Sequence, residues 1–352
     1  MTTNMLFGTI IKELRNQKNL KLIDLSTQIG MDKGLLSKIE NNERRATKDQ
    51  VEKFIQVLDA NPQMLHTSWL ASKIIYELED QDYGLEALKL AEQIVKYNAI
   101  KSESLEDLEI DLIALKNQLD TYRPIPALQL ENLINAYKID YTFESNRIEG
   151  NTLTLQETAL VIEKGLTING KSMREHLEAI NHAEAIDFIA DLVKYNTPFT
   201  ERILLQIHSL LLRGIDKENA GRYRNIQVRI GGSAYLPPAP YLIQKQMEDY
   251  FLFYETNVTK MHPIVLAADM HEKLVTIHPF IDGNGRTSRL VMNLIALQNG
   301  YPLINISGEK MNRMDYYNAL EQVQVHGNNK VFRLLVANYS KASLNEWIKV
   351  CS

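Results

Sequence analysis

Apolar residues recur at the three- and four-residue spacing of an α-helix along almost the whole chain, and this periodicity most limits the folds open to it. One stretch alternates as a strand does, namely NIQVRIGGSAYLPP (225–238), with Ile226, Val228 and Ile230 on one face and Gly231-Gly232 as the turn. We therefore predict a mainly α-helical fold that carries one small β-hairpin.

Composition and charge exclude several classes of protein. The 352 residues give room for two or three domains, and a net charge of −5 argues against a globally basic nucleic-acid binder. The only cysteine, Cys351, excludes an internal disulfide and suits a reducing compartment. Because no apolar run approaches a membrane span and the N-terminus lacks signal-peptide features, we expect a cytoplasmic protein without a membrane partner.

Two proline-containing breaks suggest domain boundaries, DANPQ near residue 62 and TYRPIPALQ near residue 125. They predict a small first domain over 1–65, a helical linker over 66–125 and a larger domain over 126–352. The linker carries no chemical motif, and we expect it to pack against other helices or to form a homodimer contact.

The first domain contains two short amphipathic helices joined by a tight turn, within LKLIDLSTQIGMDKGLLSKIENNERR (20–45). Gly30 permits the turn and Asp32 is placed to cap the second helix. This pattern resembles the helix-turn-helix of the Cro/phage-repressor (XRE) family, whose second helix enters the major groove of DNA.

The resemblance implies that residues of the second helix and the following turn contact DNA. Two departures from the family stand against it: Leu22 replaces a usual polar glutamine, and Ser26 replaces a usual alanine. A helical bundle kept for protein contacts is the alternative. The DNA-contacting residues implied are Lys33, Ser37, Lys38, Arg44 and Arg45.

The stretch GLTINGKS (165–172) satisfies the phosphate-loop pattern G-x-x-x-x-G-K-S. A phosphate loop follows a buried parallel strand, whereas LQETALVIEK before this stretch has helical spacing. We predict an ordinary loop between two helices.

The stretch HPFIDGNGRTSR (278–289) opens a helix with two arginines, Arg286 and Arg289, although a helix N-terminus favours acidic residues. This placement indicates that both side chains bind an anion. Gly283 and Gly285 allow backbone N–H groups to converge on a phosphate.

Two further side chains complete a phosphoryl-type transfer site in this stretch. Asp282, beside the phosphate cradle, is suited to hold Mg²⁺ by one oxygen. His278 is the one side chain of the stretch that can accept a proton near neutral pH.

This stretch matches the Fic (Fido) signature H-x-F-x-D/E-G-N-G-R-x-x-R at every specified position, and the resemblance extends over roughly 126–340. Fic proteins are α-helical, and most of them transfer AMP from ATP to a hydroxyl of a protein, so the resemblance implies both for this chain. The resemblance implies that His278 deprotonates a target Ser, Thr or Tyr and that Asp282 coordinates Mg²⁺. It also implies that the hairpin is a flap that docks the target by strand addition through Val228, Ile230 and Tyr235. The nucleotide-binding residues implied are Gly283, Asn284, Gly285, Arg286, Arg289 and Tyr317.

A second motif lies in YTFESNRIEGNTL (141–153), where Ser145 and Glu149 share one helix face and Gly150 ends the helix. It resembles the inhibitory S/T-x-x-x-E-G/N motif of regulated Fic proteins, here within a helix near 141–150. The resemblance implies that Glu149 pairs with Arg289 and occupies the space of the ATP γ-phosphate.

The motifs together predict a protein adenylyltransferase that uses ATP and Mg²⁺, modifies protein hydroxyls including its own, and is coupled to DNA binding. Two alternatives stay open. One is a transcription regulator whose Fic domain chiefly senses nucleotide. The other is a phosphodiesterase that removes AMP from modified proteins, with Glu149 orienting a water molecule.

Overall fold

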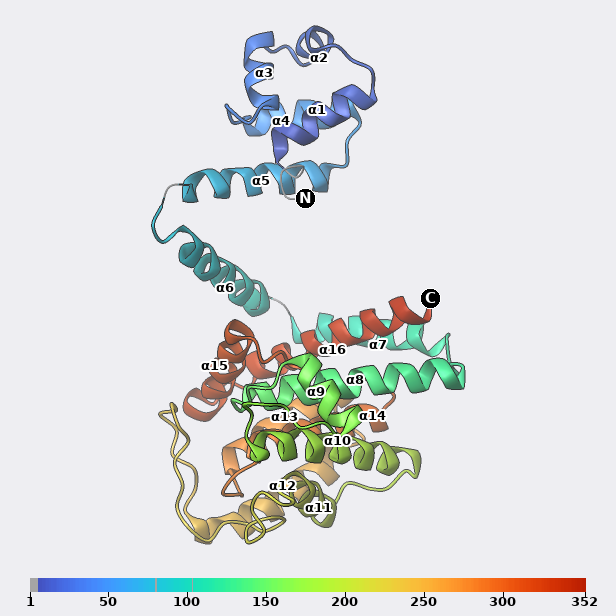
Figure 1. Cartoon of the computed structure of the whole chain (residues 1–352), viewed down its shortest axis with the longest axis vertical. Coiled ribbons are helices and arrows are strands. Elements are labelled where there is room, and N and C mark those ends of the chain that lie inside the picture. Colours follow the sequence, from blue (N-terminus) through green and yellow to red (C-terminus); the bar gives the residue numbers. More distant parts are fainter. Residues whose placement is uncertain (1–5, 80, 103) are drawn as a thin grey trace. The chain divides into compact units, whose positions relative to one another are not determined.

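A computed structural model describes residues 6–79, 81–102 and 104–352 of the chain. Over these residues the regular structure is helical, with sixteen α-helices and one short 3₁₀ helix (Figure 1). The chain forms two compact units that divide between Lys96 and Tyr97. None of the described helices is long and apolar enough to span a bilayer.

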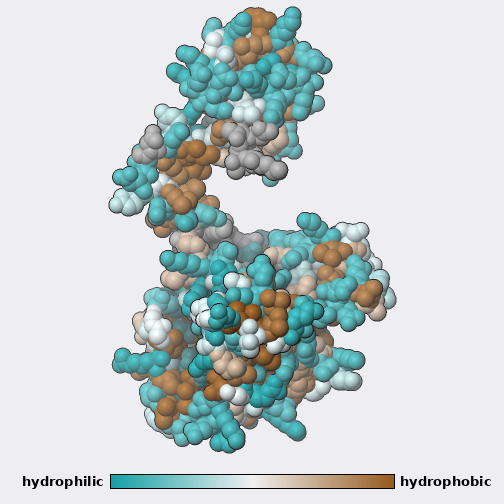
Figure 2. Space-filling view, viewed as in Figure 1, coloured by the Kyte–Doolittle hydropathy of each residue, from teal (hydrophilic) through white to brown (hydrophobic). Residues whose placement is uncertain are grey.

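The first unit is a bundle of helices around its own apolar core. The helices are α1 (Phe7–Gln17), α2 (Leu22–Ile29), α3 (Lys33–Glu40), α4 (Lys48–Leu58) and α5 (Pro62–Leu78), followed by α6 (Gly84–Ser102), which crosses the division between the units. In Figure 2, apolar side chains gather on the surface of α6, where Leu85 is 60% exposed and Val95 is 67% exposed.

Helices α2 and α3 adopt the expected helix-turn-helix. Gly30 ends α2 in the left-handed region with φ of 65°, and the Asp32 side chain accepts a hydrogen bond from the Leu35 backbone N–H at 3.0 Å. Both local predictions are therefore confirmed. Gly8 lets α1 approach α3 closely, since a Cβ at this position would lie 2.0 Å from the Ile39 carbonyl oxygen.

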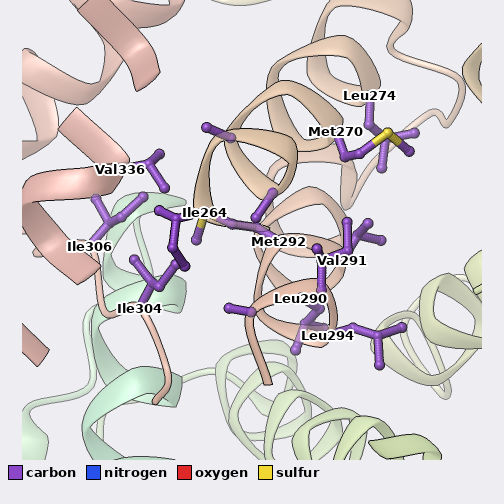
Figure 3. Close-up of a cluster of buried hydrophobic side chains, with 14 of the residues drawn as sticks. Ile264, Met270, Leu274, Leu290, Val291, Met292, Leu294, Ile304, Ile306 and Val336 are labelled. Carbon is purple, nitrogen blue, oxygen red and sulfur yellow. The ribbon is translucent and has the colours of Figure 1, made fainter. Parts of the chain in front are cut away.

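The second unit is built around the helical hairpin of α13 (Pro263–Ile277) and α14 (Asn284–Gln298) (Figure 3). Both helices are buried over most of their length, with α14 against α10 and α11 and α13 against α12 and α16. The other elements are α7 (Leu105–Asp120), α8 (Ala127–Ile148), α9 (Leu155–Lys164), α10 (Met173–Lys194), α11 (Glu201–Leu211), η2 (Pro240–Leu242), α12 (Ile243–Asn257), α15 (Lys310–His326) and α16 (Lys330–Cys351).

The segment 66–125, expected as a linker, divides between the two units. Its first part belongs to α5, which packs on α1 and α4. Its last part is α7, which lies along α16 and buries Leu108, Leu112 and Leu119 in the core of the second unit. The segment lacks a chemical motif, but its two ends pack into the two units, so this stretch is not a spacer throughout.

The predicted β-hairpin is wrong, because residues 225–238 form no strand in the described structure. Side chains join the two arms here: the Gln227 amide donates to the Pro237 carbonyl at 2.9 Å, and Arg224 donates to the Ile226 and Pro238 carbonyls. Pro237 and Pro238 have no backbone N–H, which removes two donors that a strand ladder would need. The segment is therefore an irregular loop, which we call the flap loop.

The phosphate-loop pattern is confirmed as an ordinary loop between helices. Gly165 ends α9 in the left-handed region with φ of 62°, and the Ser172 side chain caps α10. No strand precedes it among the described residues.

Candidate active site

The residues of HPFIDGNGRTSR form the tight connection between α13 and α14. His278 ends α13 in the left-handed region, with φ of 52°, and Gly283 precedes α14 with φ of 78°. The Asn284 side chain holds the loop, accepting from the Phe280 N–H at 3.0 Å and donating to the Phe280 carbonyl at 2.9 Å. What Asn284 offers to a ligand is consequently its backbone, since its side chain is buried in this contact.

His208 of α11 supports the same loop through ring stacking and a hydrogen bond. Its ring stacks on fully buried Phe280 with centroids 3.7 Å apart. Its Nδ1 accepts from the Gly221 N–H at 2.9 Å, so Nε2 carries the hydrogen and donates to the Asp282 carbonyl at 2.9 Å. Burial lowers the pKa of His208 to about 4, and the ring is neutral near pH 7.

His278 is half-buried and neutral near pH 7. Burial lowers its pKa below the ordinary value for histidine, and the positive charge of Arg224 lowers it further. Nδ1 lies 3.3 Å from the Val275 carbonyl, which can only accept, so Nδ1 carries the hydrogen. The neutral ring therefore keeps Nε2 as its basic nitrogen.

A chain of alternating charges surrounds Asp282. Its Oδ2 accepts from Arg174 at 2.5 Å, and its Oδ1 lies 3.3 Å from Arg286 and accepts from the Gly283 N–H at 2.6 Å. Glu178 lies within 3.2 Å of Arg286 and 3.1 Å of Arg174. Burial would raise the pKa of Asp282, but Arg286, the Gly283 N–H and Arg174 together hold it below its ordinary value.

Arg174 and Glu178 were not singled out from the sequence as site residues. They lie at i and i+4 in α10, so both project from one face of that helix. The sequence signal was present as an Arg-Glu pair at helical spacing, but such pairs are common on exposed helix faces.

Arg289 is completely buried, and the end of α8 supplies most of its partners. Nη2 donates to Glu149 Oε1 at 2.7 Å, Nε donates to Ser145 Oγ at 3.0 Å, and Nη1 donates to the Tyr316 hydroxyl at 3.3 Å. Burial alone would lower the pKa of Arg289, yet the charge of Glu149 raises it above the ordinary value. The structure thus brings Ser145 and Glu149 together with Arg289, which lies 140 residues after Glu149 in the sequence.

The Glu149 carboxylate also lies directly over the turn that begins α14. A Cβ added to Gly285 would lie 2.4 Å from Glu149 Oε1 and 3.1 Å from Arg289 Nη1. Glycine at this position therefore gives an anionic group access to the helix N-terminus, where the helix dipole favours negative charge. In this structure the anion there is Glu149.

Curated proteins named as protein adenylyltransferases resemble this chain over more than half of its length. It is 34% identical to the "Protein adenylyltransferase Fic" of Nematostella vectensis over 70% of this chain and 57% of that protein. It is 37% identical to the "Protein adenylyltransferase fic-1" of Caenorhabditis elegans over 59% of this chain and 41% of that protein. The chain thus spans about half the length of these curated relatives.

Folds and family patterns agree with these resemblances. A crystal structure of a Fic domain containing signaling protein from Bacteroides thetaiotaomicron matches with a TM-score of 0.63 and 25% identity, covering 68% of this chain and 96% of that one. Residues 198–296 match the Fic/DOC family, and residues 11–65 match a helix-turn-helix family. The chain carries a helix-turn-helix domain that is followed along the sequence by a Fic/DOC domain.

Tyr317 of α15, expected near the nucleotide, contacts the C-terminal end of α8 in this structure. Its hydroxyl donates to the Ile148 carbonyl at 3.0 Å, one residue before Glu149. Gly308 packs against the same turn of α8, since a Cβ there would lie 2.9 Å from the Glu144 carbonyl oxygen. The end of α8 is therefore held by α14, by α15 and by the segment before α15.

The three flap residues expected to dock a target, Val228, Ile230 and Tyr235, are half-buried in the flap loop. Tyr235 donates its backbone N–H to the Ser233 hydroxyl at 3.1 Å, and Ser233 donates its own N–H to the Ile230 carbonyl at 3.3 Å. These contacts form a local turn at the tip of the flap loop. The role of the three side chains stays a prediction.

In the helix-turn-helix domain, the residues implied to bind DNA differ in exposure and in the contacts that they make within the protein. Lys33, Lys38 and Arg44 are exposed, and Ser37 is half-buried on α3. Arg45 pairs with Glu77 of α5 at 3.0 Å and lies 3.5 Å from the centre of the Tyr76 ring. Contact between Arg45 and a phosphate would therefore compete with these exposed internal contacts.

Proposed function

We propose that this chain transfers AMP from ATP to a Ser, Thr or Tyr hydroxyl of a protein, and that Glu149 restrains the reaction. The observation that carries the proposal is that one short connection holds neutral His278 at its start and leads into an anion-binding surface, which is made by the start of α14, Arg286 and Arg289. The activity named for the Nematostella vectensis and Caenorhabditis elegans relatives supports it.

In the proposed reaction, Nε2 of His278 accepts the proton of the target hydroxyl as its oxygen attacks the α-phosphorus of ATP. The bond from the α-phosphorus to the β-phosphate oxygen breaks, and pyrophosphate leaves with that electron pair. Because the chain forms no covalent bond in this step, catalysis rests on positioning and on electrostatic stabilisation by the N–H groups and arginines of α14.

The residues around Asp282 fit a magnesium ion bound chiefly through nucleotide phosphates. The described residues contain no group of three or more acidic, histidine or cysteine side chains arranged for a metal, which suits an ion that takes most of its ligands from phosphate and water. Asp282, with its lowered pKa, is ionised near pH 7 and could supply one oxygen after separating from Arg174. Magnesium would supply positive charge to the phosphates.

The proposed restraint rests on competition for one buried cation. Arg289 favours an anionic partner strongly, because stranding a buried charge costs about 3–5 kcal/mol. Glu149 supplies that anion at 2.7 Å in this structure. In the active state the γ-phosphate of ATP would replace it, so Glu149 and ATP exclude each other from part of the site.

Replacing His278 with alanine should abolish transfer and leave ATP binding largely intact, because the imidazole acts on the hydroxyl. Loss of a general base costs on the order of 10²- to 10⁴-fold in rate. The measurement is incorporation of labelled AMP together with the ATP dissociation constant, with His326→Ala as a control at an exposed histidine. Labelling by His278→Ala near the parent rate would contradict the mechanism.

Glu149→Gly should increase AMP transfer, including self-modification. If removal of the carboxylate adds about 1.4 kcal/mol to productive nucleotide binding, product at limiting ATP rises about tenfold. The matched control is the double variant with Arg289→Ala, which also lacks the cation and should not be activated. Initial rates of labelled AMP incorporation distinguish the three proteins.

Two results would reject the restraint. Equal rates for the parent and Glu149→Gly would show that Glu149 does not inhibit. A fall in AMP removal from a modified protein on losing Glu149, with no gain in transfer, would favour the phosphodiesterase instead.

We also propose that the helix-turn-helix domain binds DNA, supported by the match of residues 11–65 and by the exposed cations Lys33, Lys38 and Arg44. Replacing Arg44 and Arg45 together with alanine should weaken binding and reduce the salt dependence by about two phosphate contacts. Replacing Lys12 and Lys18, two exposed lysines of α1 and its C-terminal cap, is the control. A mobility-shift assay at low salt that detects no binding to upstream or random duplex would reject this proposal.

A further inference from the structure

Arg224, the last residue of GRYR (221–224), is 4% exposed and binds only backbone carbonyls through its side chain. Nε donates to the His278 carbonyl at 2.8 Å, Nη1 to the Ile226 carbonyl at 2.8 Å, and Nη2 to the Pro238 carbonyl at 2.7 Å. Its backbone N–H donates to the Pro279 carbonyl at 2.8 Å. One residue therefore contacts both arms of the flap loop and two successive residues, His278 and Pro279, of the connection between α13 and α14, which we call the His278 loop.

A buried guanidinium usually has a carboxylate partner, because taking the charge out of water is costly. Arg224 forms no ion pair within the described part of the chain, and burial lowers its pKa. The four carbonyl contacts are thus what holds it in place. Five guanidinium donors in a rigid fork suit a residue that must fix several backbone segments at once.

The two arms of the flap loop are joined by side chains. The loop lacks strands, and the Gln227 amide is the other side-chain link between its arms, at 2.9 Å from the Pro237 carbonyl. On the other side of Arg224, His278 has φ of 52°, a left-handed conformation that is costly for a residue with a Cβ. The direction of the His278 carbonyl, and with it the plane of its backbone, is held by Arg224 Nε.

We propose that Arg224 is a positioning residue that joins the flap loop to the His278 loop, so that a target segment seated on the flap aligns the imidazole with the hydroxyl. This inference rests on the proposed AMP transfer. It assigns Arg224 no contact with ATP, so the binding of nucleotide should not depend on it.

The test compares Arg224→Met and Arg224→Lys with Arg222→Met, all in a Glu149→Gly background. Arg222 belongs to the same GRYR stretch but is exposed, which makes it a matched control. Both Arg224 variants should lower kcat for labelled AMP incorporation by about 10- to 100-fold, because small misplacement of a reacting group costs that much. The ATP dissociation constant should stay within about two-fold of the background protein.

The pH profile separates positioning from a general loss of structure. The charged groups that act on the pKa of His278 are Arg224, Asp282 and Glu149, the last absent in this background. Because the charge of Arg224 lowers that pKa, Arg224→Met should move the acid limb of kcat to higher pH. Arg224→Lys keeps the charge but not the fork, so it should lose kcat with little movement of the limb.

A readout that does not need transfer keeps the inference testable if the proposed function fails. Arg229 is exposed in the flap loop and is a trypsin site, so cleavage after it should be faster in both Arg224 variants than in Arg222→Met. Titration of the His278 ring by NMR should show a raised pKa in Arg224→Met. If the background protein transfers no AMP but both of these changes occur, the proposed function is wrong, and the proposed link between the flap loop and the His278 loop is supported.

Three outcomes would overturn the inference. The first is kcat within about two-fold of the background protein in both folded variants. The second is unchanged flap cleavage in both variants together with an unchanged His278 pKa in Arg224→Met. The third is loss of folding in both variants, which would make Arg224 a structural residue. Folding is expected to survive, because removing a cation that has no acidic partner strands no opposite charge.

Discussion

The buried ion pair between Arg289 and Glu149 is the contact on which the arrangement of the site depends. A fully buried arginine in the second turn of α14 adds positive charge close to the helix N-terminus, where the dipole already supplies it, so the position requires an anion. Glu149 meets that requirement from the end of α8, over Gly285. Helices α8, α14 and α15 therefore meet at one charged point, which is where the proposed nucleotide phosphates would lie.

The rest of the second unit makes that point rigid on one side and adjustable on the other. Phe280, Asn284 and His208 fix the His278 loop from the core through stacking and paired hydrogen bonds. On the outer side, the partner of Asp282 is the exposed Arg174, whose contact can be exchanged, whereas buried Arg224 holds the flap loop in place. A site with a fixed base and exchangeable anions suits a reaction in which nucleotide and protein target bind in turn.

The pairing of Glu149 with Arg289, 140 residues later, was implied by the resemblance to regulated Fic proteins. Sequence motifs predicted the loop residues His278 to Arg289 and the helix-turn-helix with its Asp32 cap, because each depends on local spacing. They did not predict the absence of strands in 225–238, where alternation was outweighed by side-chain bridges and two prolines lacking N–H donors. Residues that act across long sequence distances, such as Arg174, His208 and Arg224, gave no distinct local signal. Their roles depend on which backbone carbonyls and carboxylates the fold brings to them.

The central claim is that Glu149 and the γ-phosphate of ATP compete for Arg289. The most direct measurement is calorimetric binding of ATP and of ADP, each with Mg²⁺, to the parent and to Glu149→Gly. ADP lacks the γ-phosphate, so removal of Glu149 should tighten ATP binding by about tenfold or more while changing ADP affinity little. An equal gain for both nucleotides, or no gain for ATP, would contradict the claim.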